Sequence, residues 1–396
     1  MLRIAFKMLA GDRAKYLGLV AGIAFTCFLV TFAASFFCGF MTRSYALIAE
    51  NPLADVWVMD RAVASVEPAT NIASSALDRV RSVEGVRFAT PLAVGTAEVR
   101  FADGRFQSFQ VIAVDDKTLA GAPAAVGSEA TLRAPDAAIV AAGGTTGKLE
   151  TPAHAADQWP GDGPHLGVAT RALAAGDEIQ VNDHRMVVSG TADALPRFPP
   201  RPLLYTTLST AHRVLLPERH RLTFVLVSVQ PGSSPPAVAR AIEARTGLRA
   251  RTADEFKEDT VLWTLENSED VGDVTAMLLL AMSVGFGATG IMLSLFTSEH
   301  RRQYAVLRAM GATPGELLVM IAFQAGTCAV LGSGLGLGLC ALLGQAASGL
   351  LELPFRMMWF TPLAGVASVI VVSVVAAAVS ARPILRLEPA SVFAGR

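Results

Sequence analysis

The segment Gly143–Leu149, with the sequence GGTTGKL, contains the glycines and the lysine that a phosphate-binding loop uses. In a Walker A loop the backbone N–H groups of a glycine-rich turn cradle phosphates, and Ser or Thr follows the Gly-Lys pair. The motif also needs a glycine five residues before that pair, but Ala142 stands there, and Leu149 follows the lysine. We therefore expect no nucleotide site in this chain, and no ATP hydrolysis by the chain alone.

The histidines and cysteines do not have the spacing of metal ligands. Structural zinc sites use closely spaced pairs of Cys and His, whereas the histidines of residues 154–220 are scattered and no cysteine accompanies them. We interpret these histidines as surface residues and the cysteines as small apolar packing residues. No nucleophile is paired with a base either, so we predict no catalytic residue, no metal site and no cofactor. The side chains concerned are His154, His165, His184, His212, His220, Cys27, Cys38, Cys328 and Cys340.

One short segment, Glu299–Glu316, has the pattern of a surface that binds a partner. Three apolar side chains recur every three residues beside arginines, as on an amphipathic helix. Gly311 is suited to ending that helix. Thr313 and Glu316 form a capping box that begins the next one, with Pro314 at its first position. The alternative is a loop that only anchors the chain at the cytoplasmic face of the membrane. Such a loop would need the arginines, but neither the apolar stripe formed by these three side chains nor the helix caps. The residues assigned to this contact are Arg301, Arg302, Tyr304, Leu307, Arg308, Met310 and Gly311.

The composition places these residues in a membrane protein. Hydrophobic residues make up 52% of the 396, charged residues 17%, and the mean hydropathy is +0.45. Because soluble chains carry about 25% charged residues, we exclude disorder, nucleic-acid binding driven by bulk positive charge, and an ordinary cytosolic enzyme. Residues 43–270 hold 22 Lys/Arg against 28 Asp/Glu, a net charge of −6, so the remainder carries +5.

Four blocks without Asp, Glu, Lys or Arg are each long enough to cross a bilayer, which takes about 20 helical residues. They predict four transmembrane helices with a large α/β domain between the first and the second. A cleaved signal peptide is the alternative for the first block, but its apolar region would be only about 7–15 residues long. We therefore expect a retained anchor. The blocks are Tyr16–Thr42, Val274–Ser298, Leu317–Leu351 and Met357–Ala381.

The short basic segments predict the orientation, since cytoplasmic loops carry an excess of Lys and Arg. The N-terminus, the 299–315 loop and the C-terminal tail are rich in cations, whereas the 346–361 loop offers only Arg356. Both termini are thus expected in the cytoplasm and residues 43–270 outside it. All four cysteines fall inside the expected spans, which leaves the outer domain without a disulfide.

The region between the first two blocks has the pattern of a mixed α/β domain. A β-α-β unit is expected from Thr223 to Arg251, with its helix closing at Gly247. Gly121–Gly167 is rich in Ala, Gly and Pro, and we expect a long surface excursion there. Thr42–Asn51 and Thr260–Asp273 are expected to extend the first two spans as helical stalks. The expected strands are Ala54–Met59, Thr96–Phe101, Phe106–Val114, Glu178–Val188 and Thr223–Val229, and the expected helices are Ala73–Val83 and Pro235–Thr246.

The third block carries a helix-packing pattern. Gly332, Gly334, Gly336 and Gly338 give two overlapping G-x-x-x-G pairs. Small residues at this spacing let helices approach closely, where van der Waals contact replaces the missing hydrophobic drive. The pattern predicts tight packing and offers only weak support for a homodimer.

The segment Arg302–Thr313, with the sequence RQYAVLRAMGAT, resembles the signature that follows the second span of FtsX-like (MacB-like) ABC transporter permeases. The ending Pro383–Ala390, PILRLEPA, is similar to the tail of that family, and the order of one span, a large outer domain and three spans also matches. Residues 6–35 look more like the stand-alone DevC-type permeases than like the ATPase-fused ones.

The resemblance implies a non-catalytic permease, as a homodimer or pseudo-dimer in the inner membrane, bound to two copies of a separate ATPase that holds the ATP. ATP binding would move the 301–310 coupling helix, and the stalks would transmit the motion outward, with a periplasmic adaptor as a further partner and no nucleic acid. The implied segments are 1–42 (N-terminus and first span), 43–270 (MacB-like core), 271–298 (second span), 299–316 (coupling loop), 317–345 (third span), 346–361 (outer loop) and 362–396 (fourth span and tail).

Three functions remain open at this point. The first is a permease for efflux, export or lipid/lipoprotein handling by mechanotransmission, and the second is an FtsX-type regulator of a cell-wall hydrolase. A sensor with an outer ligand domain is the weakest, because a signalling domain should follow Ser298, whereas the chain re-enters the membrane twice.

The orientation can be tested with a membrane-impermeant thiol reagent on intact cells. Cysteines substituted at Asp116 or Asp183 should react, and those at Arg308 or Arg386 should react only after permeabilisation. Labelling of Arg308→Cys from outside would reverse the assignment.

Overall fold

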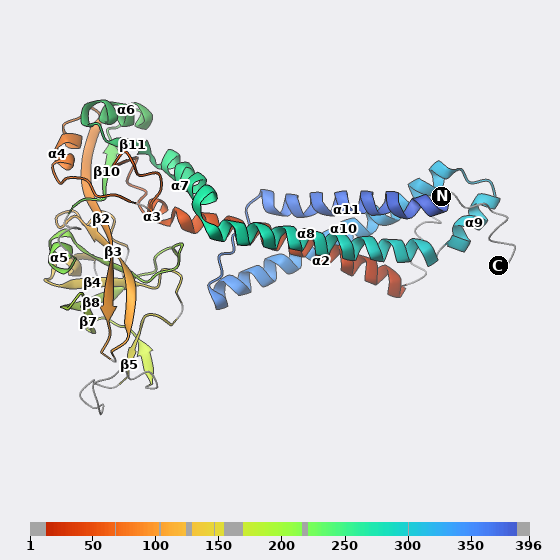
Figure 1. The fold of residues 1–396 in the computed structure, drawn as a ribbon, viewed down its shortest axis with the longest axis horizontal. Coiled ribbons are helices and arrows are strands. Elements are labelled where there is room, and N and C mark those ends of the chain that lie inside the picture. The colour runs from red at the N-terminus through yellow and green to blue at the C-terminus, as the bar shows by residue number, and fades with distance from the viewer. Residues whose placement is uncertain are drawn as a thin grey trace. The chain divides into compact units, whose positions relative to one another are not determined.

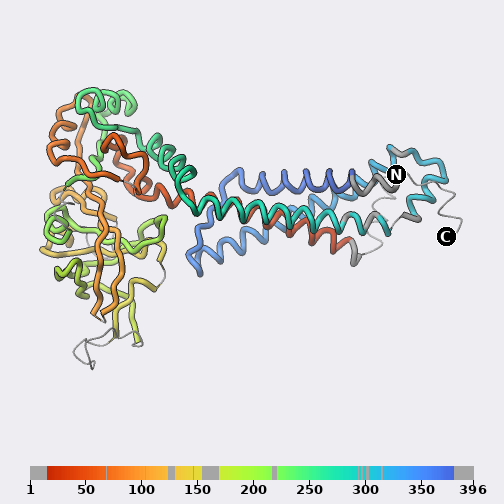
Figure 2. The backbone as a smooth tube through the Cα atoms, in the orientation of Figure 1, coloured from red at the N-terminus to blue at the C-terminus, as the bar shows by residue number. Residues whose placement is uncertain are grey.

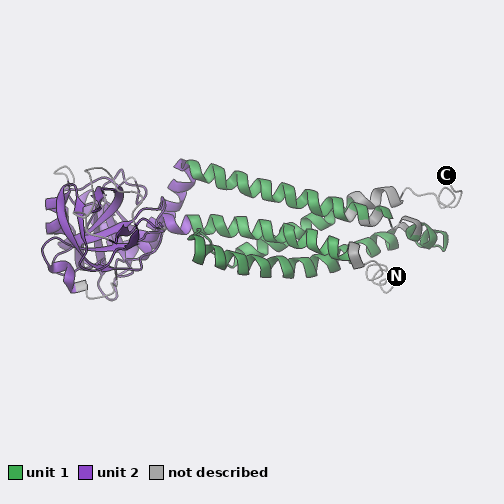
Figure 3. Ribbon diagram, turned by 90° about the horizontal axis from the view of Figure 1, so that it is seen from below, with its two compact units in different colours: residues 1–40, 269–396 green, residues 41–268 purple. Residues whose placement is uncertain are grey.

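The structure, a computed structural model, describes residues 13–67, 69–102, 104–123, 129–145, 147–153, 169–215, 221–299 and 301–385 (Figure 1). The chain divides into two compact units (Figure 3). Residues 1–40 and 269–396 form a unit of helices, and residues 41–268 form a unit built on a sheet. The chain passes between them twice, so the sheet unit is an insertion between the first helix and the others.

Within the described residues, four helices are long and apolar enough to cross a membrane. Three contain an uncharged block completely and the fourth contains residues 360–381 of its block, so the prediction of four membrane-spanning helices is confirmed. The third of these helices, Pro314–Leu351, is longer than the expected span 317–345. The loop after it is therefore shorter than the expected 346–361. These helices are α2 (Arg13–Ser44), α8 (Glu269–Glu299), α10 (Pro314–Leu351) and α11 (Phe360–Leu385).

Polar contacts join α2 to two other spans. The Thr26 hydroxyl donates to the Gly285 carbonyl oxygen of α8 at 2.9 Å and lies 2.7 Å from the Thr289 hydroxyl. Nearer the other end, the Ser35 hydroxyl donates to that of Thr361 on α11 at 3.1 Å. Hydrogen bonds between transmembrane helices contribute about 0.6–2 kcal/mol each, so these contacts fix which faces of α2 the neighbouring helices meet.

The second unit contains a nine-stranded sheet in the order β11-β1-β10-β2-β3-β9-β4-β8-β7. Neighbours are antiparallel except β3 with β9 and β4 with β8. Strand β7 also pairs with the end of β2, so the strands from β2 to β7 in this order close on themselves. The strands are β1 (Val56–Met59), β2 (Val86–Arg100), β3 (Phe106–Val114), β4 (Ala137–Ala141), β7 (Glu178–Val181), β8 (His184–Thr191), β9 (Leu203–Thr207), β10 (Phe224–Val229) and β11 (Arg249–Thr252), with β5 (Glu150–Pro152) and β6 (Thr170–Ala172) paired apart.

Alternation along the strands divides the apolar side chains between two faces of the sheet. Val56 and Val58 of β1 join the cluster covered by α4 (Ala76–Arg81), α5 (Leu208–Val214) and α6 (Pro235–Thr246). Trp57 and Met59 point the other way, into a cluster with α3 (Ala46–Ala49) and the start of α7 (Ala253–Asn267). The segments that follow α2 and precede α8 therefore cover one face of the sheet together.

The expected β-α-β unit is present as β10-α6-β11, which can be followed along the tube in Figure 2. Two prolines begin α6, and Gly247, with φ 71°, ends it. Strand β1 lies between β10 and β11 and is antiparallel to both, so the unit is split by the strand that comes first in the chain.

The surface excursion expected at Gly121–Gly167 is wrong for residues 137–141, which form β4, buried between β9 and β8. Its sequence, AAIVA, is mostly alanine, a residue depleted in strands, so the run did not indicate a strand. Residues 154–168, including His154 and His165, lie outside the described residues. The expected strand Glu178–Val188 is two strands with a turn, whose residues Asn182 and Asp183 have φ 45° and 65°.

Neither expected stalk is a plain continuation of its span. Helix α2 ends at Ser44, and the four-residue α3 follows after Tyr45. In the connection from the sheet unit to the second span, Ser268 separates α7 from α8, with φ −90° and ψ 123°. A capping box at Thr252 and Glu255 fixes the start of α7.

An aromatic cluster attaches α7 to the sheet. Phe256 is fully buried, with its ring centroid 5.8 Å from that of Trp57 and 5.9 Å from that of Phe224. Phe256→Ala should therefore lower the free energy of unfolding of this unit by about 3–5 kcal/mol. Tryptophan fluorescence of the full chain during denaturation measures the change. Leu262→Ala on the same helix, where Leu262 is 56% exposed, is the control and should have little effect; equal losses would exclude this role for Phe256.

Candidate functional site

A short helix, α9 (Arg301–Ala309), connects α8 to α10. Gly311, with φ 98°, ends it as predicted. The Ala312 N–H donates to the Leu307 carbonyl at 3.0 Å and the Gly311 N–H to the Arg308 carbonyl at 3.1 Å. These two bonds form a Schellman motif, in which a left-handed residue satisfies the last carbonyls of a helix.

The turn after α9 leads directly into α10 through the predicted capping box. The Thr313 hydroxyl accepts from the Glu316 N–H at 3.3 Å, and the Glu316 carboxylate accepts from the Thr313 N–H at 2.8 Å. Both helix ends at this junction thus have hydrogen-bonded partners, which leaves little freedom between α9 and the start of α10.

The inner face of α9 packs against α10, and this corrects the expected apolar stripe. Tyr304 is only 1% exposed and joins a buried cluster with Leu317, Met320 and Ile321. Its hydroxyl donates to the Gln324 side-chain carbonyl at 2.9 Å. Burial raises the pKa of Tyr304 to about 12. Tyr304 therefore joins α9 to α10 and is not available to a partner.

The outer face of α9 exposes a different apolar pair. Met310 is 78% exposed, as the stripe required, and Val306 is 43% exposed, whereas Leu307 is half-buried against the Tyr304 cluster. Spacing of three residues suggested Tyr304, Leu307 and Met310, but a helix turns every 3.6 residues, so positions 306 and 310 share the outer face. The i, i+4 spacing of Val306 and Met310 in the sequence could have identified this exposed face. The side chains of Arg301 and Arg302 lie outside the described part, and Arg308 is half-exposed.

The glycines of α10 divide into two pairs with different surroundings. A Cβ on Gly332 would lie 2.6 Å from the Ile23 Cγ2 atom, and one on Gly336 would meet the backbone of Ala24, both on α2. No atom of the described residues would lie within 4 Å of a Cβ on Gly334 or Gly338. The first pair therefore packs α10 against α2, while the second lies on a face that the described residues leave open.

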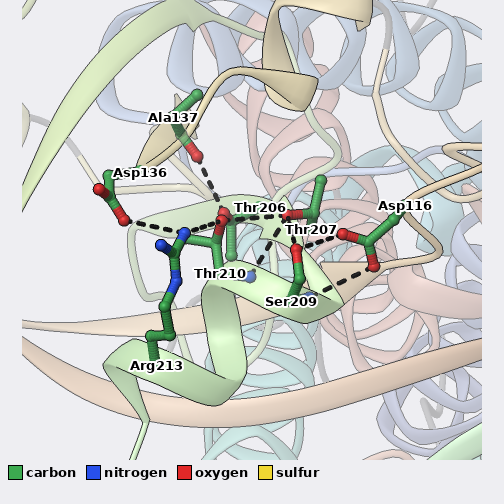
Figure 4. Close-up of polar contacts among 8 residues, drawn as sticks. All are labelled: Asp116, Asp136, Ala137, Thr206, Thr207, Ser209, Thr210 and Arg213. Atoms are coloured by element: carbon green, nitrogen blue, oxygen red, sulfur yellow. Dashed lines mark hydrogen bonds and ion pairs between the residues drawn. The ribbon is translucent and has the colours of Figure 1, made fainter.

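A second polar cluster surrounds α5 (Figure 4) and lies beside a cavity of about 510 Å³. The Asp116 carboxylate accepts from the Ser209 N–H at 3.3 Å and from its hydroxyl, at the start of α5. Arg213 pairs with Asp136 at 3.1 Å. These groups satisfy one another and tie α5 to the ends of β3 and β4, so we assign the cluster to the fold.

The phosphate-loop candidate also has a local role. Gly143 and Gly144 are in the left-handed region, with φ 60° and 88°, and the Gly143 carbonyl accepts from the Arg197 N–H at 3.0 Å. A Cβ on Gly143 would collide with the Arg201 carbonyl, so the glycines allow two loops to meet. No group of three His, Cys, Asp or Glu side chains in the described ranges could hold a metal ion.

Comparison with known proteins gives family matches over most of the chain. Residues 17–245 match the MacB-like periplasmic core domain, and residues 275–389 match the FtsX-like permease C-terminal model. No curated protein matches.

Two solved structures resemble part of the chain. The periplasmic region of MacB from Actinobacillus actinomycetemcomitans is 10% identical, covering 55% of this chain and 94% of that one, with a TM-score of 0.36. The extracellular domain of the ABC-type transporter YknZ from Gram-positive bacteria is 11% identical, covering 50% and 98%, with a TM-score of 0.32.

The two glycine pairs of α10 predict different losses of stability for the same Gly→Leu substitution. Gly336→Leu forces side-chain atoms into the α2 backbone and should destabilise the bundle by about 1–3 kcal/mol or more, the usual cost of overpacking. Gly338→Leu makes the same change on the open face and should cost far less. The aggregation temperature of the detergent-solubilised chain compares them. Equal losses would mean that Gly336 has no special contact.

Proposed function

The chain belongs to the FtsX-like ABC transporter permeases with a MacB-like periplasmic core domain, and from this membership we propose that it couples ATP hydrolysis in a separate subunit to motion outside the cytoplasm. The motion serves efflux, export or lipid/lipoprotein handling. The chain itself performs no catalysis, and two ATPase copies bind a pair of permease chains in the inner membrane.

The observation that carries this proposal is the division of α9 into two faces. Tyr304 holds the inner face against α10, while Val306 and Met310 leave an apolar outer face. An amphipathic helix with such a face docks in a groove of a partner, which buries the apolar anchors. On the ATPase this groove would receive Val306 and Met310, and its rim would carry acidic groups that complement α9.

The orientation in this proposal follows the basic segments. Helix α9 and both termini face the cytoplasm, and residues 41–268 lie outside it. When the ATPase subunits close on ATP, α9 moves with them, and the capped junction passes the motion to α10. The segments around α3 and α7 then carry the motion into the sheet, so cargo need not pass between the spans.

A second copy of this chain completes the transporter in this proposal. The open face of α10 at Gly334 and Gly338 offers a place for close helix contact, and small residues favour such contact in lipid. A periplasmic adaptor would join the outer unit if the system is an efflux pump.

The role of α9 can be tested by placing a charge on its outer face. Met310→Asp and Val306→Asp should each weaken ATPase binding by about 2 kcal/mol or more, roughly 30-fold in Kd, because an anchor of the interface is lost. Co-purification and ATP turnover in nanodiscs measure the effect, and the permease chain alone should hydrolyse no ATP.

Leu53→Asp is the matched control, since Leu53 is an exposed apolar residue of the outer unit. It should leave ATPase binding unchanged. If the α9 variants assemble and turn over normally, α9 is only a topological anchor.

A further inference from the structure

Glu50, directly after α3, is held by three donors of the outer unit. Its carboxylate accepts from the Leu195 N–H, from the Arg197 guanidinium and from the Tyr205 hydroxyl, the last at 3.1 Å. The Arg197 side chain is only 5% exposed and that of Glu50 17%. The segment that follows α2 thus ends in a buried ion pair with groups far along the chain.

These donors belong to β9 and to the loop that precedes it, residues 192–202. Tyr205 lies within β9, whose neighbours are β3 and β4. The other end of the loop is fixed as well, because the Ala192 N–H donates to the Val140 carbonyl of β4 at 2.9 Å. A displacement of Glu50 would therefore act on β9 and on the loop that precedes it.

A second paired carboxylate, Asp259, lies on α7, which directly follows β11 and leads back to α8. It pairs with Arg249 at 2.6 Å and with Arg251 at 3.1 Å. Both arginines lie on β11, at one edge of the sheet. A carboxylate on each connecting segment is thus held by two side chains of the sheet or of its loops.

The two attachments lie on the same face of the sheet but on strands far apart in its order. Strands β1, β10, β2 and β3 separate β11 from β9. Apolar packing of α3 and α7 in one cluster fixes their position over the sheet, but such packing is non-directional. Ion pairs held by several donors have a defined direction, so each carboxylate transmits displacement to one strand.

We propose that Glu50 and Asp259 are positioning residues that transmit the movement of the first and the second connecting segment to β9 and to β11 respectively. This proposal rests on the proposed function, because it assumes that ATP drives those segments. The two carboxylates therefore act separately, and loss of one uncouples one part of the sheet.

The test compares hydrogen–deuterium exchange of the full chain with its ATPase in nanodiscs, with and without ATP and Mg²⁺. Glu50→Gln/Arg197→Met removes both charges of the buried pair, so no unpaired buried charge remains. Nucleotide-dependent exchange should then be lost in residues 192–207 and persist in residues 249–252. Asp259→Asn should give the reverse pattern.

Asp136→Asn/Arg213→Met is the matched control. It removes an ion pair of the same unit, 3.1 Å long, that does not involve Glu50, Arg197 or Asp259, and it should change neither response. A purely structural role would alter exchange equally with and without nucleotide. Persistence of the nucleotide response at residues 192–207 in the Glu50 variant would overturn the proposal.

If the double variant does not fold, Tyr205→Phe gives the decision, since it removes the donor to Glu50 that lies on β9 and leaves the Glu50–Arg197 ion pair intact. A normal nucleotide response at residues 203–207 in that variant also overturns the assignment to β9. A different result tests the proposed function: if the unmodified complex hydrolyses ATP with no exchange response in residues 45–268, the coupling itself is excluded.

Discussion

Helices in lipid gain nothing by hiding apolar surface from one another, so the bundle depends on close contact between backbones. Gly332 and Gly336 supply it where α10 meets α2, and the Thr26 hydroxyl adds polar contacts to α8. Because charges are excluded from these spans, charged chemistry is confined to their ends. The cationic α9 connects α8 to α10, and the acidic sheet unit is inserted in the chain between α2 and α8.

Both regions use a similar arrangement, in which a short helix is tied to a larger element by a polar contact inside an apolar cluster. Tyr304 on α9 reaches Gln324 of α10 from within apolar packing. Glu50 reaches Arg197 and Tyr205 beside the cluster that buries α3. Apolar burial supplies most of the stability in such a contact and the hydrogen bond supplies direction, which suits elements that must move as one body.

The sequence predicted what depends on local patterns. Uncharged runs located the four spans, and the prolines and Gly247 fixed α6 to the residue. It failed where tertiary contact decides: β4 is a strand because of its neighbours, although alanines dominate it. It also missed Arg197, which lies 147 residues from Glu50 in the chain. For α9, the pattern located the helix and its caps, but a three-residue period assigned Tyr304 to the wrong face.

The distance along α7 between its first residues and Asp259 is a matter of helical phase. Asp259 lies seven positions, about two helical turns, after the N-cap Thr252, so its side chain returns to the side of α7 that faces β11. Each residue added between them would rotate the carboxylate by about 100° and turn it away from β11. Adding two whole turns would restore the direction but carry the carboxylate about 10 Å further along the helix. The number of residues between Thr252 and Asp259 should therefore stay constant among related permeases that use this ion pair.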